Sequence, residues 1–143
     1  MLSVTSQNAI KAVIYLCSKF DSPQNCGIKE IATYIGASEH SVGKLLQTLV
    51  RKNIINSMKG PTGGFYISEQ QKLLPVISII EAIDGNKVFK GCGLGLSRCS
   101  SAHPCPIHDS YKIIRDQMEN LFKQKKVIDL CNPITHGLAY LVG

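Results

Sequence analysis

Three cysteines and one histidine lie close together in the second half of this 143-residue chain. The pattern C-x6-C-x5-C-x2-H is formed by Cys92, Cys99, Cys105 and His108. Thiolates and an imidazole are donors that suit an iron–sulfur cluster or a zinc ion. Structural zinc sites usually contain two cysteines separated by about two to four residues, and the sequence of this segment has no such pair. The looser spacing favours an iron–sulfur cluster.

The remaining histidines and cysteines are weaker candidates for this site. His103 is a competing ligand, but its position before Pro104 favours a loop histidine. Cys17 falls on the apolar stripe of a predicted helix and is expected in the core, and no role is assigned to Cys26 or Cys131. Two alternatives stay open for the cysteine-rich segment, namely a reduced loop without metal and an oxidised loop.

The composition describes a single globular domain with an excess of basic residues. Hydrophobic residues make up 44% of the chain, and the formal net charge is +6. A chain of this length buries enough surface to fold without disulfides. The basic excess is compatible with nucleic-acid binding and with a merely soluble protein. No serine or cysteine has a base at an interpretable spacing, so the sequence does not indicate an enzyme.

The sequence carries no sign of a membrane-spanning segment or of a secretion signal. The longest apolar run, residues 73–80, is too short to cross a bilayer and contains a proline and a serine. The first residues lack the basic segment and the cleavage site of a signal peptide. We therefore expect a cytoplasmic protein with no membrane partner. In that reducing compartment a cysteine cluster is more often a metal or redox site than a disulfide framework.

Local patterns predict the elements that position these residues. Ser6 is expected to cap the first helix, Gly36 to end the second, and Ser38 to cap the third. Turn-forming residues then separate two short strands, which predicts a hairpin. Pro75 opens another helix, and a loop-like segment over 86–104 precedes a long final helix. The predicted helices cover residues 9–17, 28–35, 39–52, 76–84 and 106–125, and the predicted strands cover residues 54–58 and 65–67.

Helix, short turn, helix and hairpin follow one another in the order of a winged helix-turn-helix. The second of these helices would lie in the DNA major groove, and Lys59 would lie at the tip of the wing. No acidic residue occurs from His40 to Ser68, so a polyanion would meet a locally basic surface. The alternative is a solvated basic helix face beside an ordinary hairpin. The candidate DNA contacts are Glu39, His40, Ser41, Lys44, Gln47, Arg51, Lys59, Gly60, Thr62 and Gly63.

The hairpin and its flanks resemble a known family. Residues 59–65 read Lys-Gly-Pro-Thr-Gly-Gly-Phe, which is similar to the motif Arg-Gly-Pro-Gly-Gly-Gly-Tyr of IscR/NsrR-type winged-helix transcriptional regulators. Residues 79–85 resemble the helix that follows the wing in that family, and the likeness extends from residue 3 to near residue 130. It implies a mainly α fold with a small β-hairpin wing, in which a winged helix-turn-helix is followed by a long C-terminal dimerisation helix.

The resemblance also concerns the site residues. Sensors of this family carry three cysteines in the corresponding loop, and the IscR branch has a histidine three residues after the third cysteine. This implies that His108 is the fourth ligand of an iron–sulfur cluster. The chain departs from the family at Ser41, where an aromatic residue is common, and at Gly43, where an acidic residue reads bases. The family's operator sequence therefore does not carry over.

The final helix carries apolar residues at a coiled-coil-like spacing, which predicts a homodimer. A single helix with this stripe would expose a large apolar surface. The stripe consists of Ile107, Tyr111, Ile114, Met118 and Leu121. We expect a DNA-binding domain over residues 1–85, a cluster-binding loop over 86–105, a dimerisation helix over 106–130 and a tail over 131–143.

Together these patterns predict a homodimeric, sequence-specific transcriptional regulator, whose partners are a double-stranded DNA operator and a second copy of itself. Its signal would be redox state, iron or nitric oxide, sensed through a [2Fe-2S] or [4Fe-4S] cluster. Two alternatives stay open. One is a metal-free regulator of the same family that acts through protein or small-molecule contact. The other is a zinc-stabilised interaction module with no DNA role.

Overall fold

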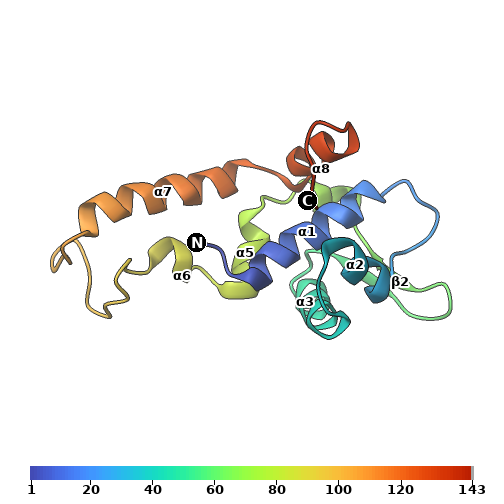
Figure 1. Cartoon of the computed structure of the whole chain (residues 1–143), viewed down its shortest axis with the longest axis horizontal. Coiled ribbons are helices and arrows are strands. Elements are labelled where there is room, and N and C mark those ends of the chain that lie inside the picture. Colours follow the sequence, from blue (N-terminus) through green and yellow to red (C-terminus); the bar gives the residue numbers. More distant parts are fainter. Residues whose placement is uncertain (143) are drawn as a thin grey trace.

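The computed structural model describes residues 1–142 and divides into two parts, which we call the body and the arm (Figure 1). The body contains α1 to α5, the hairpin and α8, and the arm contains α6, α7 and the cysteine-rich segment between them. The helices are α1 (Val4–Ser18), α2 (Ile28–Ile35), α3 (Glu39–Arg51), α4 (Glu69–Lys72), α5 (Ile77–Asp84), α6 (Lys87–Lys90), α7 (His108–Gln124) and α8 (Val127–Thr135). The strands are β1 (Asn56–Met58) and β2 (Gly64–Tyr66).

The helix-turn-helix of α2 and α3 follows from local signals. Gly36 adopts the left-handed conformation, with a φ of +71°, and so ends α2. Ser38 caps α3, because its side chain accepts a hydrogen bond from the N–H of Ser41. The predicted apolar stripe of α3 is buried as expected and consists of Val42, Leu45, Leu46 and Leu49. The sequence therefore predicts both helices to within one residue at each end.

α1 begins earlier than its apolar pattern predicts. Ser3 is the N-cap, since its side chain accepts a hydrogen bond from the N–H of Ser6. Ser6 lies inside the helix, where it is buried and donates to Asp84 Oδ2 at 2.6 Å. The prediction of Ser6 as the cap was wrong because the first turn, which contains the exposed Val4, carries no apolar stripe to mark it.

The wing is a two-stranded antiparallel hairpin that is fastened to the body at its base. Its strands are shorter than predicted, and residues 54 and 55 are buried before β1 begins. Phe65 is buried, and its backbone exchanges two hydrogen bonds with the backbone of Cys26. The short helix α4, which the sequence pattern missed, places the buried Gln71 where its amide donates to the Asn53 carbonyl at 3.1 Å. These contacts fix the direction in which the wing leaves the body.

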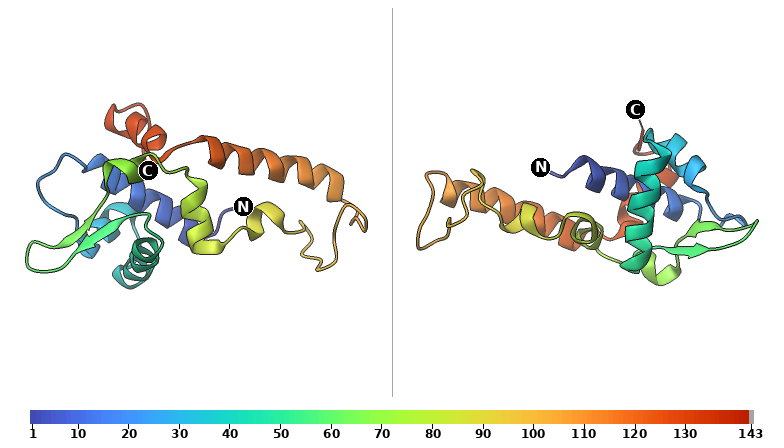
Figure 2. Two further views of the ribbon diagram at one scale, coloured as in Figure 1. Left: turned by 180° about the vertical axis from the view of Figure 1, so that it is seen from behind. Right: turned by 90° about the horizontal axis from the view of Figure 1, so that it is seen from below.

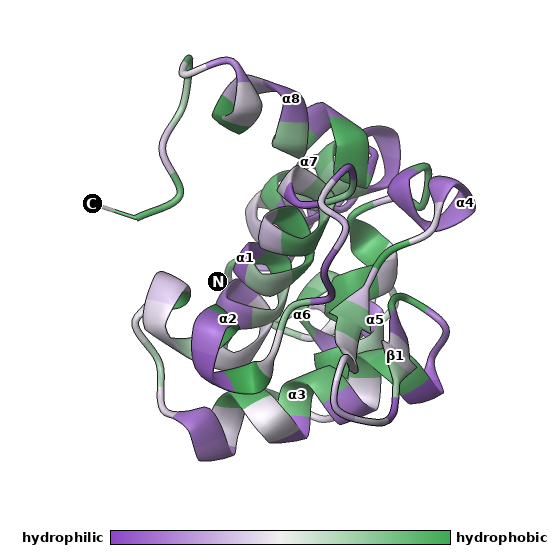
Figure 3. Cartoon of the chain, turned by 90° about the vertical axis from the view of Figure 1, so that its right-hand side faces the viewer, coloured by the Kyte–Doolittle hydropathy of each residue, from purple (hydrophilic) through white to green (hydrophobic). Residues whose placement is uncertain are grey.

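The core of the body is arranged around α1, whose residues 12–17 are all buried. α1 contacts α2, α3, α5 and α8. Figure 3 shows hydrophobic stretches on α1, α3 and α5. The exposed side chains of α3 are polar or charged and include Glu39, Lys44 and Gln47.

α8 completes this core and was missed by the sequence pattern. Val127 and Cys131 are buried against the body, and Pro133 lies inside the helix. The boundary expected between residues 130 and 131 thus falls within α8, and residues 131–135 of the expected tail belong to this helix. The sequence did not predict this helix because it contains Pro133, and proline normally disfavours a helix interior.

The arm joins the body through a second, smaller apolar cluster. Ile77, Ile80 and Phe89 form its buried centre, and Met118 and Phe122 of α7 pack against them. α6 is a single turn within a segment that was predicted as loop, and α7 begins two residues after the predicted start. From this cluster the arm extends away from the body, as both views in Figure 2 show. Among residues 1–142, no helix combines the length and apolarity that a membrane crossing requires.

Candidate metal centre and nucleic-acid interface

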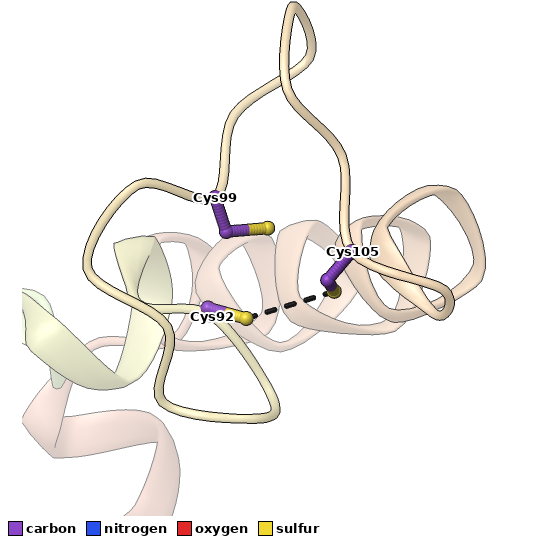
Figure 4. Close-up of side chains that lie close together, drawn as sticks. All are labelled: Cys92, Cys99 and Cys105. Atoms are coloured by element: carbon purple, nitrogen blue, oxygen red, sulfur yellow. Dashed lines mark hydrogen bonds between the residues drawn. The ribbon is translucent and has the colours of Figure 1, made fainter.

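The three predicted cysteine ligands meet at the far end of the arm (Figure 4). Cys92 follows α6, and Cys105 lies three residues before α7. The Sγ atoms of Cys92, Cys99 and Cys105 all lie within 4.8 Å of one another. Cys92 Sγ and Cys105 Sγ are 3.6 Å apart. The loop therefore brings together three thiols that are widely spaced in sequence.

His108 lies beside this group at the first residue of α7. Its Nδ1 atom is 3.1 Å from Cys99 Sγ, and the residue is only 9% exposed. Its Nε2 atom is buried and has no hydrogen-bond partner within residues 1–142. His103, the competing histidine, is exposed. The imidazole of His108 can therefore act as a fourth donor next to the three sulfurs.

The backbone of the loop changes the acidity of the thiols. Hydrogen bonds from the N–H groups of Leu96 and Leu94 lower the pKa of the Cys92 thiol to about 7. The N–H of Cys105 lowers the pKa of the Cys99 thiol, but burial and the neighbouring thiols outweigh it and leave that pKa raised. Thiolates are the metal-binding form of cysteine, and the lowered pKa raises the thiolate fraction of Cys92 near neutral pH.

Two charged residues of α7 hold the loop in place, and sequence reasoning did not single them out. Arg115 Nη1 donates to the carbonyl oxygens of Lys90 at 3.1 Å and of Gly91 at 2.7 Å, directly before Cys92. The buried Glu119 pairs with Lys90 at 3.2 Å. No local signal marks Arg115, because its partners lie 24 and 25 residues earlier in the chain.

The predicted DNA-contacting residues lie on the outer face of α3 and at the wing. All ten are exposed except Gly63, which is half-buried. Figure 2 shows the hairpin projecting from the body next to α3. The N–H of Gly63 donates to the Gly60 carbonyl at 2.9 Å, so it closes the turn and is not free to bind phosphate. A side chain at Gly63 would collide with the Met58 carbonyl, which explains the glycine there.

The predicted dimerisation stripe divides into two sets on α7. Ile107, Ile114 and Leu121 are exposed, and the neighbouring Ile113 is exposed as well. Met118 packs against the second apolar cluster of its own chain. The ring of Tyr111 lies against Gly93, where a Cβ atom would approach it to 2.9 Å. The surface available to a second copy is therefore narrower and lies more toward Ile113 than the sequence suggests.

The comparisons with known proteins agree with this architecture. Residues 2–133 match the Rrf2 family, described as "Iron-dependent Transcriptional regulator". A protein of Aquifex aeolicus named as an HTH-type transcriptional regulator is 26% identical over 134 residues, which is 92% of each chain. A protein of Rhodobacter capsulatus named as an rrf2-like regulator is 29% identical over 107 residues, which is 73% of this chain and 69% of that one.

Solved structures with the same fold include two named regulators. CymR, the global cysteine regulator of B. subtilis, has a TM-score of 0.74 at 20% identity and covers 92% of this chain and 96% of its own. T. potens IscR has a TM-score of 0.75 at 17% identity and covers 98% of this chain and 92% of its own. These likenesses confirm the predicted winged-helix fold. The match over residues 2–133 shows that the chain belongs to the Rrf2 family and is a transcriptional regulator rather than an enzyme.

Proposed function

We propose that this regulator binds double-stranded DNA as a homodimer and responds to redox state, iron or nitric oxide through an iron–sulfur cluster. Its ligands would be Cys92, Cys99, Cys105 and His108. The observation that carries this proposal is the convergence of three Sγ atoms within 4.8 Å, with the His108 Nδ1 atom 3.1 Å from one of them. The buried imidazole also supports the proposal, because its Nε2 atom has no hydrogen-bond partner within residues 1–142 and a buried polar atom without a partner costs free energy.

The donor set fits such a cluster chemically. Three thiolates bind iron strongly, whereas a neutral imidazole is a weaker and protonatable ligand. A bound cluster would supply a centre that can gain or lose electrons or be lost altogether. Because His108 is also the first residue of α7, its side chain links the ligand set directly to that helix.

The arm connects these ligands to the surface proposed for dimerisation. Arg115 fastens the start of the loop to α7, and the exposed Ile114 lies next to it on the same helix. A change in the ligand set would therefore reach the helix that sets the distance between the two DNA-binding surfaces. Such a response requires two conformations with different DNA affinities.

DNA binding would rest on basic residues around α3 and the wing. Lys44, Arg51 and Lys59 would contact phosphates, and the exposed Gln47 and His40 would contact base edges. If Lys59 neutralises one phosphate, Lys59→Ala should lower the salt slope of binding by about one unit per subunit. Lys125→Ala, on the arm, is the control and should leave the slope unchanged. An unchanged slope in Lys59→Ala removes the wing from the phosphate contacts.

The decisive experiment is an anaerobic visible spectrum with iron and sulfide analysis. Wild-type protein should show a chromophore that Cys92→Ala, Cys99→Ala and Cys105→Ala each abolish or sharply reduce. Cys131→Ala is the matched control, since that cysteine is buried in the body. His108→Ala should give a short-lived chromophore and His108→Cys a longer-lived one. If His103→Ala alone shortens its lifetime, His103 rather than His108 is the fourth ligand.

Zinc is the second candidate for the same ligands, and one distance favours it. Two sulfurs bound to a single tetrahedral zinc at about 2.3 Å lie about 3.8 Å apart. The separation of Cys92 Sγ and Cys105 Sγ is 3.6 Å, close to that value. If protein purified without oxygen contains one zinc ion per chain and neither iron nor sulfide, the ligands hold zinc and the cluster proposal fails. Protein that takes up neither metal would favour a regulator that acts through protein or small-molecule contact.

A further inference from the structure

The outer face of α3 contains a hollow that several candidate DNA contacts line together with Ile28 and Gly43, to which no role has been assigned. It has a volume of about 560 Å³, and its lining includes Ile28, His40, Gly43, Lys44, Gln47 and Arg51. Polar and charged side chains form its rim. Gly43 lies between His40 and Gln47 on the same helical face, so the lining has no side chain at this position.

Nothing in the fold requires glycine at residue 43. A Cβ atom at residue 43 would meet only Ile28 Cδ1, at 3.6 Å, which is an ordinary contact. Its backbone is helical and does not require the positive φ that favours glycine. Glycine inside a helix is less stable than alanine, so folding alone would favour alanine here. The space beside residue 43 is therefore bounded by the α3 backbone and by the Ile28 methyl, which supplies the apolar contact there.

The position of the hollow identifies what can enter it. Lys44 and Arg51 line the hollow together with one acidic residue, Glu39, and no further acidic residue follows before residue 69. The two basic side chains outnumber the single carboxylate, so the surroundings attract the phosphates of a duplex. An α-helix that enters the major groove brings its outer face against the base edges. The apolar group that a base edge presents there is the C5-methyl of thymine.

We propose that the Gly43 hollow receives the C5-methyl group of a thymine in the operator, so that Gly43 is a specificity-determining residue. This inference rests on the proposed DNA binding and adds a base preference to it. The methyl would contact the Gly43 backbone and the Ile28 methyl. Gln47, one turn further along α3, would then read a neighbouring base pair.

The test uses DNA duplexes that wild-type protein selects from a random-sequence pool. Each thymine of the selected half-site is replaced in turn by deoxyuridine, which lacks only the methyl. One replacement per half-site should weaken wild-type binding about fourfold, the effect expected for one buried methyl-sized group. The replacement at every other thymine should have no effect.

Variants at residue 43 then locate the effect. Gly43→Leu should fill the hollow and bring the thymine-to-uracil ratio of affinities close to one. Gly43→Ala should give an intermediate ratio and a higher melting temperature than wild type, so any loss cannot come from unfolding. Thr33→Ala changes an exposed residue of α2 that lies outside the hollow, and it should keep the wild-type ratio.

The outcomes separate this inference from the proposed function. If the protein binds selected duplexes but no uracil replacement changes the affinity, the hollow does not receive a thymine methyl and only this inference fails. The inference also fails if Gly43→Leu keeps the wild-type ratio. If wild-type protein selects no duplex at all, the proposed DNA binding fails as well.

Discussion

The body and the arm bury apolar surface to very different extents. The body has one continuous core that joins α1, α2, α3, α5, α8 and the hairpin. The arm has only the small cluster around Phe89 and a few polar links such as that of Arg115. Apolar burial therefore determines the shape of the body, while the far end of the arm depends on specific contacts at the cysteine-rich loop and on α7. The sensing role that we propose for the arm would benefit from this difference, because parts with few buried contacts change conformation at low cost.

The cysteines of the two parts show the same difference. Burial raises the pKa of Cys17 and of Cys26 to about 12 in the body. In the arm, backbone N–H groups lower the pKa of Cys92 to about 7. One residue type is thus an unreactive core side chain in the body and a group with a substantial thiolate fraction at neutral pH in the arm.

The largest expected effect concerns the reactivity of these thiols in metal-free protein. The group with the lowered pKa loses its proton as the pH rises through about 7, so alkylation of Cys92 should increase through that pH and then level off. At pH 7 its thiolate fraction should exceed that of Cys17 by about four to five orders of magnitude, given pKa values of about 7 and about 12. Mass spectrometry after brief iodoacetamide treatment measures this. Equal labelling of Cys92 and Cys17 in native protein would contradict the expected difference in thiol reactivity between the arm and the body. Unfolded protein is the control, because both cysteines should react there.

The next effect concerns the exposed face of α7. Ile114→Asp combined with Leu121→Asp should leave the fold intact and weaken dimerisation by about a thousandfold, because four carboxylates would have to be buried. Both residues are exposed in the single chain, whereas Met118 supports the fold and is unsuitable for this test. Sedimentation at micromolar concentration measures the mass, with Asn120→Asp as a control on the same helix. A variant that keeps the dimer mass would place the interface elsewhere.

A substitution in the core tests whether the stability of the protein depends on apolar burial in the body. Leu46 of α3 is 0% exposed, and Leu46→Ala should lower the free energy of unfolding by about 2–5 kcal/mol. Ile113→Ala on the arm, where the side chain is 58% exposed, should change it by less than about 0.5 kcal/mol. Urea denaturation at a concentration where the protein is monomeric measures both. Similar losses at the two positions would contradict the assignment of stability to the body.

The smallest expected effect concerns Arg115, which we regard as a positioning residue. Arg115→Gln removes the donor to the Lys90 and Gly91 carbonyls and should speed anaerobic metal loss to a chelator by about tenfold or less. Lys112→Gln is the matched control, since Lys112 is exposed on α7 and pairs only with Asp116. If both variants lose metal at the wild-type rate, the loop does not need this support.

Much of the body was predictable from the sequence because its signals are local. The capping residue Ser38, the helix-ending Gly36 and the stripe that includes Leu46 each act within a few residues of chain. The hairpin was predictable for the same reason, since its turn residues are consecutive. The failures were short or interrupted helices, such as α4 and the proline-containing α8, which are stabilised mainly by what they pack against.

At the candidate site, the donor types and their spacing could be predicted from the sequence, because three cysteines and a histidine are visible without any fold. The contact of His108 with Cys99, the hydrogen bonds of Arg115 to the loop and the packing of Met118 against its own chain could not be predicted in this way. Each of these depends on how α6, the loop and α7 pack together. A hydrogen bond between residues 24 positions apart leaves no periodic trace in the sequence, because its geometry is set by the packing of whole helices rather than by neighbouring residues.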